Sequence, residues 1–282
     1  MLNNIDLIQS FYRGSGIKHP SMVQVLDMDI PIPPLPVQQE IVKILDTFTE
    51  LEAELEAELE ARCKQYSYYR DKLLSFNDNM NAGRVEFKSL GEFAELVRGN
   101  GMPKSDFSDL GVGCVHYGQI YTYYGISATE TKSFVTLEKS AKLTKVDFGD
   151  VIITNTSENL DDVCKAVAWL GKEQIVTGGH ATVIKHKQNP KYLAYFFCTP
   201  DFFAQKKKYA TGTKVIDVSA KSLAKILIPI PSLEEQNRIV SILDKFDALV
   251  SDISEGLPAE ITARRQQYEH YRNKLLTFQE VA

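Results

Sequence analysis

Apolar side chains recur at steps of three and four residues in the segment from about residue 38 to 77. The positions between them are rich in Glu and other polar residues. This spacing puts the apolar residues on one face of a helix, which at 1.5 Å per residue would be roughly 60 Å long. A helix of that length is expected to pack along a second helix. The apolar face consists of Ile41, Ile44, Phe48, Leu51, Leu55, Leu59, Tyr66, Tyr69, Leu73 and Phe76.

The pattern returns near the C-terminus as an internal repeat. Residues 30–76, which we call the first repeat, match residues 228–278, the second repeat, in two blocks with 12 of 19 and 10 of 16 positions identical. The offset between the copies is 198 in the first block and 202 in the second, so the second repeat has four extra residues. An insertion of that size is about one helical turn, which a helix absorbs without turning its apolar face away. At Gly256 and Pro258 we predict a kink or a short break, because an interior proline costs about 3 kcal/mol.

The segment between the repeats, residues 84–222, has a different pattern. Apolar runs such as Val151-Ile152-Ile153 alternate with Gly and Asn, as in strands and turns, and residues 191–208 follow with helical spacing. We therefore expect an α+β protein. In it, a mixed α/β domain is flanked by two long helices that form an antiparallel coiled coil.

The N-terminal residues echo the end of this middle domain. Gly14-Ser15 and Ile17 align with Gly212-Thr213 and Val215 at the same offset of 198. We interpret the N-terminal segment as the C-terminal remnant of a first domain of the same kind. The predicted order is a remnant at 1–25, a helical region at 26–80, a complete domain at 84–222 and a second helical region at 223–282.

The charge distribution along the chain is uneven. The net charge of −5 argues against nucleic-acid binding, but residues 84–221 hold 18 Lys and Arg against 15 Asp and Glu, a surplus of +3. The four cysteines have no metal-ligand spacing and are too few for a disulfide framework, so we interpret them as reduced thiols. Because no leader-like N-terminus and no run of about 20 apolar residues is present, we expect a cytoplasmic protein without membrane contact.

Three sequence features together carry a resemblance to a known family. The order is IPIP, then a helix start with the pattern LxxQxxIVxxLD, then a closing YRxKLLxF, and each copy of the repeat contains all three. This arrangement resembles the specificity subunit of Type I restriction-modification enzymes over nearly the whole chain. Residues 148–185, from FGDVIITN to HATVIK, are also similar to the core of that family's target recognition domain.

The resemblance implies a division of labour. Residues 84–222 would be a target recognition domain that reads double-stranded DNA. The helical regions would pair antiparallel, separate such domains and dock the methyltransferase and restriction subunits. S-adenosylmethionine, magnesium and ATP would belong to those partners, so this chain would need no cofactor. The chain departs from the family's pattern because it lacks most of a first recognition domain.

Candidate DNA contacts fall into three groups. The lysine cluster at 206–208 and the Thr and Lys residues after it suit phosphate, whereas the tyrosine-rich stretch at 117–124, expected as loop or strand, and the polar turns at 98–101 and 154–157 suit base edges. Plainer interpretations are a solvated helix end, tyrosines packed on a sheet face, and simple turns. The candidates are Arg98, Asn100, Lys104, Tyr117, Gln119, Tyr121, Thr154, Asn155, Ser157, Lys206, Lys207, Lys208, Thr211, Thr213 and Lys214.

Two other functions are open. One is a stand-alone nuclease or methyltransferase with a helical dimerisation arm, but the sequence has no G-x-x-x-x-G-K-[ST] phosphate loop. We interpret His180, which has no Cys or carboxylate at a ligand spacing, as a turn or core residue. The other is a coiled-coil adaptor that does not contact DNA, which the positive charge of 84–221 disfavours. We therefore predict a non-catalytic subunit without a metal site.

With one complete recognition domain, the chain would read a single half of the family's two-part targets. A two-fold homodimer would supply the second domain and give a palindromic target. A separately encoded specificity fragment would supply it as well.

Overall fold

The computed structural model describes residues 5–13, 18–76, 85–251 and 256–278. The chain forms two compact units, one made of Met1–Cys63 with Ala248–Ala282 and the other of Lys64–Asp247. The aligned residues Gly14, Ser15 and Ile17 and the predicted boundary at Arg84 lie outside the described residues. No helix in the described part of the chain is both long and apolar enough to cross a membrane.

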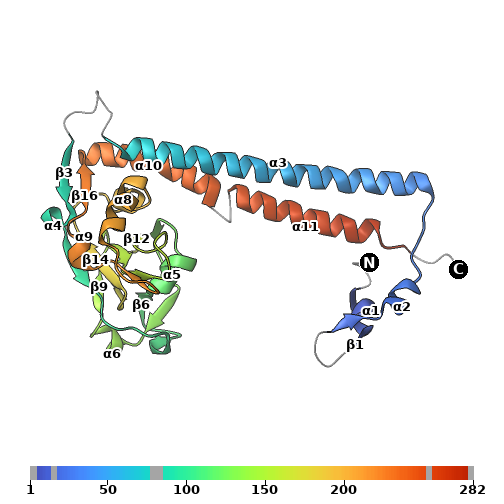
Figure 1. Ribbon diagram of the computed structural model, residues 1–282, viewed down its shortest axis with the longest axis horizontal. Helices are drawn as coiled ribbons and strands as arrows, with labels where there is room; N and C mark the ends of the chain where they lie inside the picture. The colour runs from blue at the N-terminus through green and yellow to red at the C-terminus, as the bar shows by residue number, and fades with distance from the viewer. Residues whose placement is uncertain (1–4, 14–17, 77–84, 252–255, 279–282) are drawn as a thin grey trace. The chain divides into compact units, whose positions relative to one another are not determined.

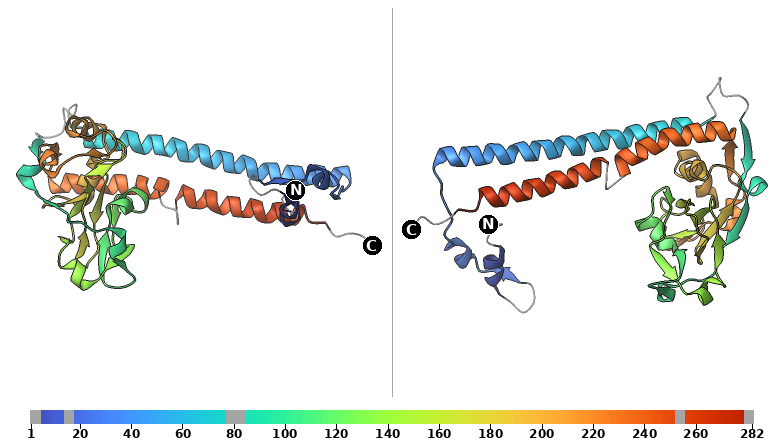
Figure 2. Two further views of the ribbon diagram at one scale, coloured as in Figure 1. Left: turned by 60° about the horizontal axis from the view of Figure 1, so that its bottom comes forward. Right: turned by 180° about the vertical axis from the view of Figure 1, so that it is seen from behind.

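The first unit contains the long helix that the apolar spacing predicts. Helix α3 (Leu35–Leu74) begins in this unit, and α11 (Leu257–Leu275) lies alongside its N-terminal part in both views of Figure 2. The two helices are antiparallel, because Phe48 stacks on Tyr271 whereas Glu56, later in α3, pairs with Arg265, earlier in α11. The long antiparallel helices are as predicted.

The break in the second repeat is also as predicted. Helix α10 (Leu233–Ser251) ends before Gly256, which is the N-cap of α11, and Pro258 lies in the first turn of α11. Proline is tolerated there, because a first-turn N–H has no partner within the helix.

The N-terminal elements repeat the end of the middle domain. They are α1 (Ile5–Ser10), β1 (Tyr12–Arg13), β2 (His19–Pro20) and α2 (Met22–Leu26). The pair Arg13↔His19 has its counterpart, 198 residues later, in the bridge Thr211↔Asp217. Likewise α2 corresponds to α9 (Ala220–Leu223).

The second unit contains the middle domain, which is built on two five-stranded sheets (Figure 1). The first has the order β4 (Glu95–Arg98), β14 (Ala181–Lys185), β10 (Val151–Thr154), β12 (Ala166–Trp169) and β7 (Ser127–Ala128). The second has the order β5 (Phe107–Ser108), β8 (Ser133–Val135), β6 (Val112–Val115), β13 (Ile175–Thr177) and β9 (Thr144–Val146). Two short ladders join β11 (Thr156–Ser157) to β15 (Ile216–Asp217) and β16 (Leu227–Ile230) to β3 (Glu86–Ser89).

Helices cover these sheets and complete the core. Strands β10 and β12 are buried along their whole length, which explains why Val151–Ile153 and Ala166–Trp169 are apolar runs rather than alternating ones. Tyr192 and Tyr195 of α7 and Ile239 of α10 are each fully buried in the same core. The helices of the domain are α4 (Leu90–Phe93), η2 (Lys104–Asp106), α5 (Tyr117–Thr122), α6 (Leu137–Ser140), α7 (Pro190–Phe196), α8 (Pro200–Tyr209) and α9.

Candidate nucleic-acid interface

Helix α5 carries the tyrosines that the sequence places in a loop or strand, so that prediction was wrong. The side chain of His116 caps the helix, because its Nδ1 accepts the N–H of Gly118 at 3.1 Å. In return, Oε1 of Gln119 accepts the N–H of His116 at 3.1 Å. This reciprocal capping starts a helix, and Tyr117 and Tyr121 therefore share one face, with ring centroids 6.5 Å apart.

The imidazole of His180 packs against this face. His180 has a φ of 70°, a left-handed conformation that non-glycine residues rarely adopt. Its Nδ1 lies 3.0 Å from Oγ1 of Thr156, and its ring centroid lies 5.0 Å from that of Tyr117. The hydroxyl of Tyr121 donates to the carbonyl of Thr156 at 2.7 Å. The histidine is therefore held by Thr156 and Tyr117 while it stays exposed.

A short hairpin continues this surface. Thr156 pairs with Asp217, and the carboxylate of Asp217 lies 3.7 Å from Nη2 of Arg98. Gly212 turns the hairpin with a φ of 99°, and a Cβ there would lie 2.0 Å from the carbonyl oxygen of Val215. Only glycine fits this turn. We call the resulting surface the Tyr117 patch; it consists of Arg98, Tyr117, Tyr121, Thr156, His180, Asp217 and the exposed hairpin residues Thr211, Thr213 and Lys214.

The protonation states follow from burial. Burial, with help from nearby Lys104 and His180, lowers the pKa of His116, which keeps the imidazole neutral and able to accept a hydrogen bond as a helix cap. Burial also raises the pKa of Tyr121 to about 12, so its hydroxyl stays protonated and donates to Thr156.

Some of the predicted DNA-contact residues use their side chains for hydrogen bonds within the domain instead. Thr154 and Asn155 are fully buried. The amide of Asn155 donates to the carbonyl of Val218 at 2.8 Å and accepts the hydroxyl of Thr182 at 2.8 Å. Gln119 caps α5 and donates to Oγ of Ser133 at 2.6 Å. These side chains make their hydrogen bonds within the domain, where they hold the loops of the patch.

The three lysines at 206–208 also differ in burial. Lys206 is 4% exposed, and its ammonium donates to the carbonyls of Asp161 at 2.9 Å and Val163 at 2.6 Å. The structure thus corrects the predicted phosphate contact of Lys206. Lys207 and Lys208, in the last turn of α8, are exposed.

Of the other candidates, Ser157 adjoins the patch, because it pairs with Ile216 and its side chain interacts with Tyr121. Lys104 is exposed at the start of η2. Asn100 is exposed and donates to the carbonyl of Lys142 at 2.8 Å, and Ser157 is half-buried at the end of β11. Among the described residues, no three His, Cys, Asp or Glu side chains gather in a way that would hold a metal ion.

Sequence reasoning missed His180 as a member of the patch. The glycine pair before it was the available signal, because Gly178 and Gly179 let the backbone approach Asn100 closely. A Cβ on Gly178 would lie 2.2 Å from Cβ of Met102. The glycines therefore serve close backbone packing, which places His180 at the surface rather than in the core.

Known proteins are similar to this chain over most of its length. Residues 1–62 and 83–263 match the family described as the Type I restriction modification DNA specificity domain. The chain belongs to this family. The Type I restriction enzyme EcoR124I/EcoR124II specificity subunit of Escherichia coli is 36% identical over 89% of the chain, and a putative type I restriction enzyme specificity subunit of Haemophilus influenzae is 33% identical over 98%. The chain spans 61% and 70% of the lengths of these relatives.

Solved structures of the family share the fold. A chain from a study of complex assembly and conformational transition of the type I R-M system has a TM-score of 0.67, with 18% identity, and covers 97% of this chain and 67% of its own length. The HsdS subunit from Thermoanaerobacter tengcongensis has a TM-score of 0.56, with 16% identity, and covers 96% of this chain and 67% of its own length. At these identities the likeness is one of fold.

Proposed function

We propose that this chain reads one half of a two-part DNA target through the Tyr117 patch. The observation that carries the proposal is the joining of Arg98, Tyr117 and His180 with an exposed hairpin on one surface. Guanidinium and imidazole groups bind base edges, tyrosines contact sugars and thymine methyl groups, and Thr and Lys bind phosphate. Such a mixed surface suits sequence reading better than a uniformly basic one.

The remaining exposed lysines support a second, sequence-independent contact. Lys207 and Lys208 extend from the end of α8, and Lys214 from the hairpin. Cations at such positions neutralise backbone phosphates and set the position of the domain on the duplex.

We further propose that the chain addresses partner subunits to DNA and performs no chemistry itself. The family membership and the specificity-subunit names of its relatives support this role. Methyl transfer and DNA cleavage, with S-adenosylmethionine, magnesium and ATP, would belong to methyltransferase and restriction subunits docked on the two repeats. Because its substrate would be the DNA inside the cell, we place the chain in the cytoplasm.

Methylation mapping tests the proposed function. The wild-type chain and the Tyr117→Ala variant are expressed with the methyltransferase subunit, and methylated positions are mapped across the host genome. The wild type should direct methylation to a defined sequence, and the variant should lose it. Tyr123→Ala is the matched control, because Tyr123 is 57% exposed at the other end of α5 and contacts Lys132 rather than the patch. An unchanged pattern for Tyr117→Ala would remove the patch from the interface.

A further inference from the structure

His180 is held on the Tyr117 patch by contacts to both its backbone and its ring. The backbone N–H of Asn155 donates to the carbonyl of His180 at 2.8 Å. Oγ1 of the next residue, Thr156, lies 3.0 Å from Nδ1 of the imidazole. The ring of Tyr117 packs on the imidazole with centroids 5.0 Å apart and planes 49° apart. The imidazole is therefore held at one edge and on one face.

Thr156 is itself held in place. It is 9% exposed, it pairs with Asp217, and its carbonyl accepts the hydroxyl of Tyr121 at 2.7 Å. Helix α5, strand β11 and the loop before β14 thus converge on His180. A side chain that reads a base has to be held in this way, because a mobile one would lose conformational entropy on binding and could turn towards several bases.

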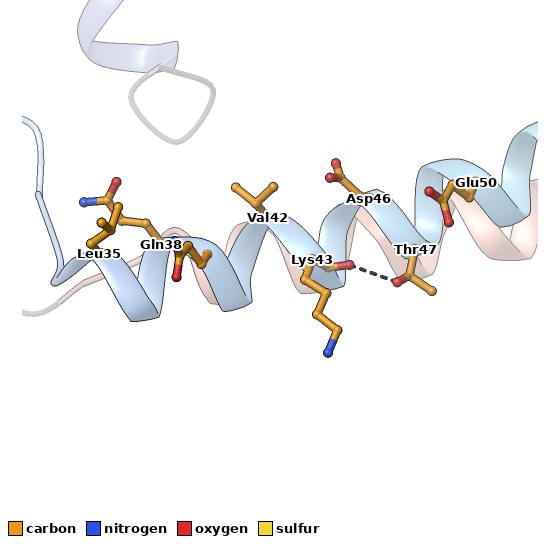
Figure 3. Close-up of a pocket in the computed structure, with 8 residues that line it drawn as sticks. Leu35, Gln38, Val42, Lys43, Asp46, Thr47 and Glu50 are labelled. Atoms are coloured by element: carbon orange, nitrogen blue, oxygen red, sulfur yellow. Dashed lines mark hydrogen bonds between the residues drawn. The ribbon is translucent and has the colours of Figure 1, made fainter.

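The side chains that line an open groove on α3 provide a contrast. The lining residues, from Leu35 to Glu50, all belong to this one helix (Figure 3). The hydrogen bond drawn there, from the hydroxyl of Thr47 to the carbonyl of Lys43 at 2.9 Å, stays within the helix. None of these lining residues is held by several elements as His180 is.

The hydrogen bond between Thr156 and His180 decides which ring nitrogen carries the proton. Among the described residues, Nδ1 of His180 is the only partner of Oγ1 of Thr156. If Nδ1 donated to this oxygen, the buried hydroxyl of Thr156 would keep a proton without an acceptor, which costs free energy. The hydroxyl therefore donates to Nδ1, and the proton of the neutral imidazole is on Nε2. Protonation of the ring would leave this N–H in place.

The N–H at Nε2 is the group that His180 offers to a ligand. His180 is exposed, and in the described part of the chain its Nε2 has no hydrogen-bond partner. In the major groove, guanine and adenine both present the acceptor N7, thymine presents O4, and cytosine presents only an amino donor. A purine fits a single N–H best, because N7 is unobstructed at the groove edge, whereas the methyl group of thymine lies beside O4.

We propose that His180 is the purine-reading residue of the Tyr117 patch. Its Nε2 donates to N7 of one guanine or adenine in the half-site, and Thr156 is the positioning residue that sets the tautomer. The contact rejects cytosine at that position and accepts either purine. The proposal rests on the proposed function for the place where DNA binds, and it adds the base class and the atoms that meet.

NMR of the chain without DNA tests the tautomer. The chain has five histidines, so isotopically labelled imidazole nitrogens give few signals, and the variant His180→Gly identifies those of His180. At mildly alkaline pH we expect Nε2 to be protonated and Nδ1 unprotonated, both in the wild type and in Thr156→Ser, which keeps the hydroxyl. In Thr156→Val the second tautomer should become populated. A proton on Nδ1 in the wild type would overturn the proposal, even if the patch binds DNA.

Modified bases test the contact with N7. Methylation mapping first defines the half-site, and each of its purines is then replaced in turn by the 7-deaza analogue, which has C–H in place of N7. Affinity is measured for the chain assembled with the methyltransferase subunit. At one purine, the replacement should weaken wild-type binding by about 10-fold, as expected for the loss of one hydrogen bond. In His180→Gly, the same replacement should cost nothing further, and the other purines should behave as in the wild type.

The threonine variants separate positioning from general damage to the fold. Thr156→Ser should keep the 10-fold effect of the sensitive purine, because its hydroxyl still donates to Nδ1. Thr156→Val should lose most of that effect while its response to the other purines stays unchanged. Equal responses of the two variants at the sensitive purine would show that Thr156 does not position the ring.

Two further results would overturn the proposal. One is wild-type affinity that no 7-deaza purine lowers, because no N7 would then be contacted. The other is a sensitive purine whose replacement costs as much in His180→Gly as in the wild type, because another residue would then read it. Either result leaves the proposed function standing if Tyr117→Ala loses target methylation. If Tyr117→Ala keeps it, the proposed function fails, whatever the tautomer of His180.

Discussion

The ring of Phe48 stacks on the ring of Tyr271 with centroids 5.4 Å apart and planes 25° apart. At the equivalent positions of the other repeat, Phe246 stacks on Tyr69 with centroids 5.5 Å apart and planes 21° apart. Each phenylalanine near the start of one repeat thus meets a tyrosine near the end of the other. This reciprocity explains why both repeats keep the same aromatic positions, since each position contributes to its own pair of an antiparallel coil.

Removing either phenylalanine should weaken the coil to a similar extent. Phe48 and Phe246 are both half-buried, so Phe48→Ala and Phe246→Ala should each lower the free energy of unfolding by about 2 kcal/mol. Urea unfolding followed by circular dichroism measures this. Phe48→Leu, which keeps apolar volume but loses the ring stack, should cost about half as much. Equal stability of all variants and the wild type would show that the ring pairs contribute nothing.

Much of the helical architecture could be predicted because its signals are local. The spacing of apolar residues gives α3, and Gly256 with Pro258 gives the break before α11. The pairing of the two helices also follows, because similar apolar faces must be buried. These inferences need only residues that are neighbours in sequence or related by the repeat.

The candidate site was harder to predict because its side chains form hydrogen bonds with residues that are far away in the sequence. Asn155 looks like a polar turn residue, but it bonds to Val218 and Thr182. The capping interaction between His116 and Gln119 turns an apparent strand into α5. No local pattern reveals which polar groups the fold uses internally.

The variant His180→Gly should lose DNA recognition without losing thermal stability. Glycine adopts the φ of 70° at this position without strain, so the variant should unfold at the same temperature as the wild type or slightly above it. The loss of the imidazole should nevertheless abolish or relax target methylation when the variant is assembled with the methyltransferase subunit. Thermal unfolding measures the stability of the variant, and methylation mapping on the same preparations measures its target specificity. Retained target specificity would show that His180 does not read DNA.

Acid should destabilise the middle domain through His186. Burial lowers the pKa of His186 to about 4 from 6.5. As the pH falls below 6.5, the unfolded chain takes up a proton that the folded chain does not, so stability is lost between pH 6.5 and 4. The full difference corresponds to about 3 kcal/mol.

The variant His186→Asn isolates this effect. Asparagine does not titrate, and it keeps an acceptor for the N–H of Gln188, which His186 accepts at 3.1 Å through Nδ1. Between pH 7 and pH 4.5, the wild type should lose about 2 kcal/mol more than the variant in urea unfolding. Parallel losses would mean that other groups, such as the carboxyl of Asp147 with its lowered pKa, account for the acid sensitivity.

The three consecutive lysines of α8 should behave differently when changed. Lys207 and Lys208 are exposed, so replacing both with Ala should weaken DNA binding evenly across sequences and reduce the salt slope of the affinity by about two. Lys206→Met instead leaves the carbonyls of Asp161 and Val163 without a donor, so it should cost about 2 kcal/mol of stability. The DNA affinity of Lys206→Met should have the same salt slope as that of the wild type, because the ammonium of Lys206 lies in the interior. Fluorescence anisotropy of a labelled duplex between 50 and 200 mM salt, beside urea unfolding, measures both. If Lys206→Met were as stable as the wild type but its DNA affinity depended less steeply on salt, the ammonium of Lys206 would contact phosphates. Its proposed structural role would then be wrong.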